Sequence, residues 1–161
     1  MKEFDNLTSD ESYFHKKVVN FIINLYQKDK GSLPPSVFLK SAKGELKLHP
    51  IPVHFFQSEN PEELIEEGIN AILDDYGADY ACFGSECAFG KVPTSELKKP
   101  VKSIEDSLEQ SVVLSFENIK SDDIYFYRFL VTDDKTLQIK ELTAYTTEDI
   151  EYSTMFKLFK K

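Results

Sequence analysis

The sequence predicts an α+β fold: a mainly antiparallel β-sheet of about five to six strands with two main helices packed on it. One observation is the run Ile124–Val131, which is apolar at odd and even positions apart from one arginine and contains no Gly or Pro. A strand of this kind is covered on both faces, so we expect a central strand in the middle of the sheet and not an edge strand. The other observation is that two segments with helical spacing alternate with short β-branched and aromatic segments. The 161 residues suit one domain, 1–161, with a single core.

The first helix is expected within residues 8–31. Thr8 or Ser9 can cap its free N–H groups, and Glu11 follows Thr8 at the spacing of a capping box. Gly31 is expected to end the helix in a left-handed conformation. Apolar residues at helical spacing predict a face that lies on the sheet. They are Phe14, Val18, Val19, Phe21, Ile22, Ile23, Leu25 and Tyr26.

A β-hairpin follows, with strands at residues 37–42 and 45–49. They are joined at Gly44, which can take the positive φ of a tight turn. Pro50 and Pro52 lack the N–H that a central ladder needs, so we expect this hairpin at an edge of the sheet.

The second helix begins with Asn60 as the cap and Pro61 at the first helical position, and it ends at Gly77. Its apolar stripe consists of Leu64, Ile65, Ile69, Ile72, Leu73 and Tyr76. Its other face is purely acidic, because no Lys or Arg lies between Gln57 and Gly77. The acidic residues are Glu59, Glu62, Glu63, Glu66, Glu67, Asp74 and Asp75.

The rest of the chain predicts four more strands and one long connection. The strands are expected at residues 79–90, 111–117, Ile124–Val131 and Leu137–Tyr145. Residues 91–110 are polar and are expected to form a flap or loop. Residues 53–57 fit an edge strand or a loop, and residues 148–161 fit a short docked helix or a last strand.

The charge balance favours some partners over others. With 19 basic and 28 acidic residues the net charge is −9, which opposes binding to phosphate backbones or anionic lipid. We therefore expect no nucleic acid and no membrane as partner, and a protein with a basic surface is the favoured one. No apolar run approaches the roughly 20 residues of a membrane span, and the N-terminal residues do not resemble a secretory signal. A cytoplasmic location is expected, while the sequence predicts no oligomeric state.

No cofactor or metal is expected. The glycines are isolated and form no phosphate-binding loop. Cys82 and Cys87 lie in one predicted strand and point to opposite faces, which excludes a bridge between them. His49 and His54 are separated by two prolines and do not have the spacing of helical zinc ligands.

Two charged residues lie within predicted strands. Arg128 shares one side of its strand with Ile124 and Phe126. Either that face is open to water, or the guanidinium lies on aromatic rings and meets a carboxylate. Glu86 lies among apolar residues, where desolvation would raise its pKa and suit it to acid–base work. The alternative for Glu86 is a structural ion pair with Arg128 or with a lysine across the sheet.

Two functions from different classes follow. The first is a non-enzymatic binding or adaptor protein that contacts a basic partner through its acidic helix and the loop at residues 91–110. The binding residues expected are Glu62, Glu63, Glu66, Glu67 and Arg128. The alternative is a small hydrolase-like or metal-dependent enzyme with Glu86 as acid or base and His49 or His54 as its partner. Activity as an enzyme is the less expected of the two.

The strand at residues 81–89 carries a resemblance. It is similar to strands in a group of small bacterial and phage-borne α+β proteins that read apolar-apolar-Ser-Glu-Ala-aromatic. The matching residues are Phe83, Ser85, Glu86, Cys87 and Phe89, with the aromatic displaced by one position. The resemblance covers residues 60–145 and implies an α+β fold without an activity to carry over. Size, acidity and α+β content are also similar to those of secretion chaperones and immunity proteins.

Overall fold

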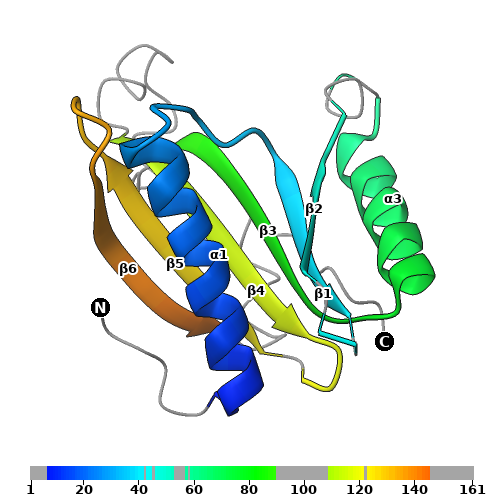
Figure 1. Cartoon of the computed structure of the whole chain (residues 1–161). Coiled ribbons are helices and arrows are strands. Elements are labelled where there is room, and N and C mark those ends of the chain that lie inside the picture. The colour runs from blue at the N-terminus through cyan, green and yellow to red at the C-terminus, as the bar shows by residue number, and fades with distance from the viewer. Residues whose placement is uncertain are drawn as a thin grey trace.

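The computed structural model contains one six-stranded antiparallel sheet and two helices, which confirms the predicted α+β class (Figure 1). It describes residues 7–41, 43–44, 46–52, 57, 59–89, 109–121 and 123–145. The strand order is β2-β1-β3-β4-β5-β6, and every neighbouring pair is antiparallel. The elements are α1 (Ser9–Gln27), β1 (Ser36–Ser41), β2 (Leu46–Pro50), α3 (Pro61–Tyr76), β3 (Ala78–Phe89), β4 (Glu109–Asn118), β5 (Ile124–Val131) and β6 (Leu137–Tyr145).

Helix α1 begins as predicted and ends differently. The Thr8 side chain accepts a hydrogen bond from the Glu11 N–H at 3.2 Å, which satisfies one free donor of the first turn. The prediction that Gly31 ends the helix in a left-handed conformation is wrong, because Lys30 takes the positive φ, 52°. Gly31 instead permits a close approach, since a Cβ there would lie 2.8 Å from Leu25 Cδ1.

The hairpin and the second helix follow their sequence signals. Strands β1 and β2 pair from Ser36 to Lys40 of β1, with β2 at the edge of the sheet and Gly44 at a φ of 86° in the turn. Helix α3 ends at Gly77, whose φ of 64° and ψ of 44° are left-handed. Asn60 occupies the cap position but its side chain makes no capping hydrogen bond.

The two helices cover opposite faces of the sheet. Side chains alternate along a strand, so Phe38 and Cys82 face α1 whereas Leu39 and Ala81 face α3. Helix α1 packs on residues of β4 and β5, and α3 packs on β1 and β3 (Figure 1). The α1 side of the core consists of Phe14, Val18, Val19, Ile22, Tyr26, Leu33, Phe38, Cys82, Val112, Leu114, Phe116, Tyr125, Tyr127 and Phe129, with His15 among them.

Strand β5 is not an edge strand, as the run Ile124–Val131 predicts, but it is next to the edge strand β6 and not in the middle of the sheet. It has β4 on one side and β6 on the other, and the middle of the sheet lies between β3 and β4. Its residues from Ile124 to Tyr127 are all buried, so both faces are covered there. Burying one such large apolar side chain contributes roughly 1.5–3 kcal/mol, which makes β5 a main source of stability.

Several expectations concern residues beyond those that the structure describes. They are the edge strand or loop at 53–56, the loop at 91–108 and the terminal segment at 148–161. Within the described part of the chain, no helix is long and apolar enough to cross a membrane.

Candidate functional site

The acidic face of α3, formed by Glu59, Glu63, Glu66, Glu67, Asp74 and Asp75, is the first candidate. All of these residues are exposed except Glu66, which is half-buried. Glu62 lies in the same helix, but its side chain is outside what the structure describes. Glu63 and Glu67 are one turn apart, so their carboxylates follow each other along the helix, and Glu59 precedes the cap residue Asn60. Residues of the apolar stripe, such as Ile65 and Ile69, are buried against the sheet and hold these carboxylates outward.

An open hollow lies beside the N-terminal half of this face. It has a volume of about 370 Å³ and is lined by Glu59, Asn60, Glu63, Leu64 and Glu67. Among the described residues, no lysine or arginine forms an ion pair with Glu59, Glu63 or Glu67. The hollow therefore combines a negative potential with room for basic side chains of a partner.

The C-terminal end of α3 adds to this negative potential. Asp74 and Asp75 are exposed near the last turn, which holds no basic residue. The helix dipole places partial negative charge at the same end, where carboxylates cost about 0.3–1 kcal/mol each. A lysine does approach this end, because Lys47 Nζ lies 5.1 Å from the centroid of the Tyr76 ring. The acidic face thus extends along the helix at a small cost in stability.

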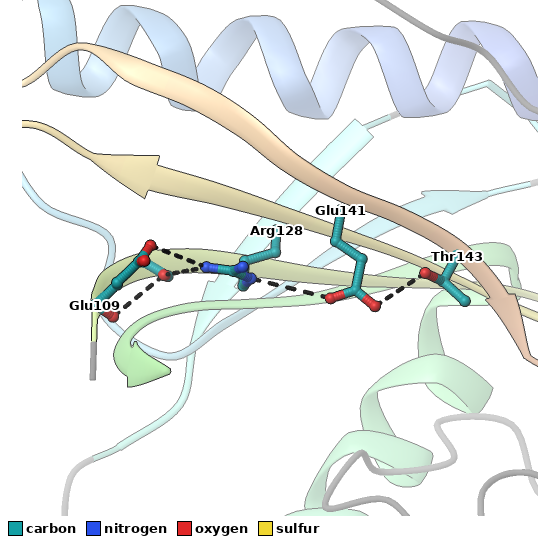
Figure 2. Close-up of polar contacts among 5 residues, drawn as sticks. Glu109, Arg128, Glu141 and Thr143 are labelled. Atoms are coloured by element: carbon teal, nitrogen blue, oxygen red, sulfur yellow. Dashed lines mark hydrogen bonds and ion pairs between the residues drawn. The ribbon is translucent and has the colours of Figure 1, made fainter. Parts of the chain in front are cut away.

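Arg128 meets carboxylates, which is the second half of one of the two alternatives for it. Its Nη1 lies 3.5 Å from Glu109 Oε2, and its Nε lies 4.0 Å from Glu141 Oε2. The same Nη1 donates to Ser111 Oγ at 3.4 Å, and Thr143 Oγ1 donates to Glu141 Oε1 at 3.0 Å. Figure 2 shows the guanidinium between the two carboxylates, one from β4 and one from β6. Together these residues form the arginine cluster.

The arginine cluster is a cross-strand brace. Arg128 and Glu141 are directly opposite each other in the β5–β6 ladder, so their side chains leave the same face of the sheet. Only 17% of the Arg128 side chain and 16% of the Glu141 side chain are exposed. The guanidinium is already shared by two carboxylates, which leaves the cluster with an excess of negative charge. Arg128 lies on the α3 side of the sheet, whereas α3 itself packs on β1 and β3, so the structure does not bring Arg128 into the acidic face.

Glu86 lies on the α1 side of β3, opposite to the face that carries Arg128. Its neighbour there is the fully buried Tyr26. Burial raises the pKa of Tyr26 above its usual range, and the Glu86 carboxylate raises this pKa further. The hydrogen bond that the Leu33 N–H donates to the Tyr26 hydroxyl, at 2.9 Å, opposes the shift. A neutral phenol beside a carboxylate is a structural arrangement, and the ion pair with Arg128 considered for Glu86 does not form.

The residues of the enzyme alternative are not brought together. His49 lies on β2 opposite Val37, on the α3 side of the sheet, and Glu86 is on the α1 side. His54 is outside the described residues. Within the described ranges, no group of three or more His, Cys, Asp or Glu is placed to hold a metal ion. The described residues therefore provide no Glu86–His49 pair for acid–base catalysis.

The two cysteines are free and lie on opposite faces of β3, as their spacing predicts. Burial raises the pKa of Cys82 well above its usual value. Burial also raises the pKa of Cys87, although the Arg128 charge opposes that shift. Both thiols therefore stay protonated at neutral pH, and neither is an activated nucleophile.

His15 is a buried polar residue whose role the apolar stripe did not reveal. Its ring stacks on Phe116 with centroids 3.9 Å apart, and its Nδ1 lies 2.8 Å from the Tyr127 hydroxyl. Burial lowers its pKa from 6.5 to about 3, so the imidazole is neutral at physiological pH. The available signal was spacing, because His15 precedes the buried Val18 and Val19 by three and four residues on the same helix face.

Comparisons with protein-family models, with curated proteins and with solved structures found no match to this chain. The resemblance of residues 81–89 to small bacterial and phage-borne proteins stays an expectation.

Proposed function

We propose that this chain is a non-enzymatic binding or adaptor protein of the cytoplasm that contacts a basic surface of another protein through the acidic face of α3. The observation that supports this most directly is the set of exposed carboxylates along one helix, beside an open hollow. Its partner is a protein with clustered lysines or arginines and is neither nucleic acid nor membrane, since a net charge of −9 opposes both.

The cost of the acidic face supports a role in binding. Glu63 and Glu67 are one turn apart, and like charges at this spacing destabilise a helix by roughly 0.2–0.5 kcal/mol per pair. A basic partner removes this repulsion and places its cations in the negative potential of the helix. Binding of this kind is fast and depends strongly on salt, because exposed charges are screened over about 8 Å at physiological ionic strength.

The test compares capture of partners by the original chain and by a variant with two neutralised carboxylates. Glu63→Gln with Glu67→Gln keeps the shape of the helix but removes two charges from the hollow. Asp29→Asn with Asp133→Asn is the matched control, because both aspartates are exposed and lie outside α3.

We expect a basic protein to be retained at low salt by the original chain and by the control. It should be released as salt rises, and the Glu63→Gln/Glu67→Gln variant should lose it. A partner that the variant holds as tightly as the original chain, at every salt concentration, would refute a role for the acidic face.

A further inference from the structure

A second surface of the opposite chemical character lies between α1 and the β1–β2 hairpin. Large apolar side chains that remain exposed gather there: of the six in the described part of the chain, Tyr13, Phe21, Leu46 and Leu48 belong to it. Their exposed fractions run from 39% for Leu48 to 57% for Tyr13. Scattered apolar residues on a surface are ordinary, but a contiguous group is typical of a docking site.

The fold leaves this surface open because α1 covers only part of its side of the sheet. The helix packs on β4 and β5, and the sheet continues beyond it through β3 to β1 and β2 (Figure 1). Leu48 is paired with Phe38 across the hairpin, and the Phe38 ring meets the Phe21 ring at 5.7 Å. Leu46 is paired with Lys40, so Leu46 and Leu48 both face the side of α1. We call Tyr13, Lys17, Phe21, Lys40, Leu46 and Leu48 the hairpin groove.

The hairpin groove carries cations in an otherwise acidic chain. At its centre is a hollow of about 30 Å³, and none of the described residues that line it is a carboxylate: they are Tyr13, Phe14, Lys17, Lys40, Gly44 and Leu46. Lys17 Nζ lies 5.1 Å from the Tyr13 ring centroid, and Lys40 Nζ lies 4.9 Å from that of Tyr80. These cation–π contacts hold both ammonium groups beside the apolar surface. The hollow is far smaller than a cofactor site, which takes roughly 300–1,000 Å³, but it admits the tip of one side chain.

Strand β2 also offers its backbone along this groove. The Ile51 N–H donates to the Pro35 carbonyl at 2.8 Å, which places Ile51 on the side that bonds to β1. Bonded and non-bonded pairs alternate in an antiparallel ladder, so the N–H and C=O groups of Leu46 and Leu48 point away from β1. Among the described strands none lies beyond β2. An added strand would find donors and acceptors there.

From these observations we infer that the hairpin groove binds an extended acidic peptide segment of another protein, which adds as a strand beside β2. Its apolar side chains pack on Leu46 and Leu48, and its carboxylates meet Lys17 and Lys40. The charge of the whole chain repels such a segment, but at physiological ionic strength screening beyond about 8 Å leaves the two local lysines dominant. This partner differs from that of α3 in charge and in the face of the sheet that it occupies.

The probe is a capped synthetic peptide of roughly nine residues in which every second residue is threonine and the positions between are alternately leucine and glutamate. Leucine and glutamate side chains then leave the same face of the added strand, the face that carries Leu46, Leu48 and Lys40. The peptide is long enough to pair along all of β2. Its counterpart has lysine in place of every glutamate. Amide chemical shifts of the isotope-labelled full chain are recorded during titration with each peptide. We expect saturable shifts at Leu46, Leu48 and Lys17 with the glutamate peptide and weaker binding of the lysine peptide.

Variants of the chain and of the peptide separate charge from strand addition. Lys17→Glu should weaken binding of the glutamate peptide by about threefold or more, whereas the control Lys140→Glu, on the exposed part of the other edge strand, should leave it unchanged. Methylation of alternate peptide amides along one edge should abolish binding, and methylation along the other edge should leave it intact.

Three results would overturn the inference: equal binding of both peptides, shifts confined to β6, or binding that neither pattern of methylation affects. A concentration-dependent dimer that Leu48→Glu abolishes would also overturn it, because the groove would then belong to a second copy of the chain. Binding at α3 is measured separately with the Glu63→Gln/Glu67→Gln variant, so failure of this inference leaves the role of the acidic face intact.

Discussion

His15 is a neutral imidazole buried among aromatic rings. With 4% of its surface exposed, it stacks on Phe116 and shares a hydrogen bond with Tyr127. Protonation would place a charge among these rings, which explains why burial lowers its pKa. The same histidine in an unfolded chain takes up a proton at its ordinary pKa of 6.5.

This difference predicts a loss of stability in acid. The unfolded state binds a proton that the folded state excludes, so the contribution of His15 is complete above pH 6.5 and declines as the pH falls toward about 3. At a pH two units below 6.5 the loss is roughly 3 kcal/mol. Urea unfolding of the original chain and of His15→Phe, from neutral to acidic pH, measures it. The variant should be less pH-dependent by about this amount, and identical pH profiles would contradict the assignment.

Arg128 is the residue whose removal should reveal the brace between strands. Arg128→Met removes the cation that the carboxylates of Glu109 and Glu141 share, and we expect a loss of about 2 kcal/mol because Glu141 is mostly buried. Arg128→Met with Glu141→Leu should lose less than Arg128→Met alone. Lys140→Met, which removes an exposed cation, is the control and should change the free energy of unfolding by under about 0.5 kcal/mol. If the losses of stability from Arg128→Met and from Glu141→Leu simply add in the double variant, the two residues are not coupled and the brace is contradicted.

The partners of Arg128 were beyond prediction for a physical reason. The alternation of side chains along a strand places Arg128 on the side of Phe126, and the structure confirms this. Which carboxylates it meets depends on register, because Glu141 faces it only through one pairing of β5 with β6. Glu109 belongs to a strand that begins before the predicted boundary at residue 111. Register is a property of the assembled sheet, which local sequence does not contain.

At the scale of elements, the two helix ends show when a glycine signal is reliable. Gly77 follows the last apolar residue of its stripe and takes the left-handed conformation, as predicted. Gly31 lies beyond a polar stretch, where α1 has already ended at Gln27 and Lys30 supplies the turn. The signal depends on how closely the glycine follows the apolar stripe.

Gly77→Ala should destabilise the protein by about 1 kcal/mol, because only the conformational cost of positive φ is involved. A Cβ at this position would meet nothing within 4 Å, so no clash contributes. Gly77→Asn is the matched control, since asparagine tolerates this conformation, and it should cost less than half as much. Thermal or urea unfolding gives both values, and equal losses for the two variants would contradict the explanation.

The acidic face of α3 and the hairpin groove differ in how much the sequence reveals. Helical periodicity alone predicted that the carboxylates lie on one side of α3. The hollow beside them also depends on Glu59 and Asn60, which precede the helix. The hairpin groove was not predicted, because Phe21 was assigned to the buried stripe of α1. Phe21 is 43% exposed because it lies at the margin of that stripe, where α1 leaves β1 and β2 uncovered.

At the scale of the whole molecule, charge and topology act together. The sheet order places β2 at one edge and keeps β5 in the interior. Strand β5, which is apolar on both faces, is therefore mostly shielded from solvent, whereas β2 of the hairpin stays exposed. The two helices lie on opposite faces, so the acidic face and the hairpin groove are directed away from each other. The two partners proposed above, which are opposite in charge, would then occupy separate sites.

The acidic face of α3 is the central claim, and the most direct measurement is amide chemical-shift mapping of the labelled chain with its captured basic partner at low and high salt. We predict shifts confined to Glu59 and Pro61–Tyr76 that weaken as salt screens the carboxylates. Shifts centred on the arginine cluster or around Glu86, or shifts that salt leaves unchanged, would contradict it.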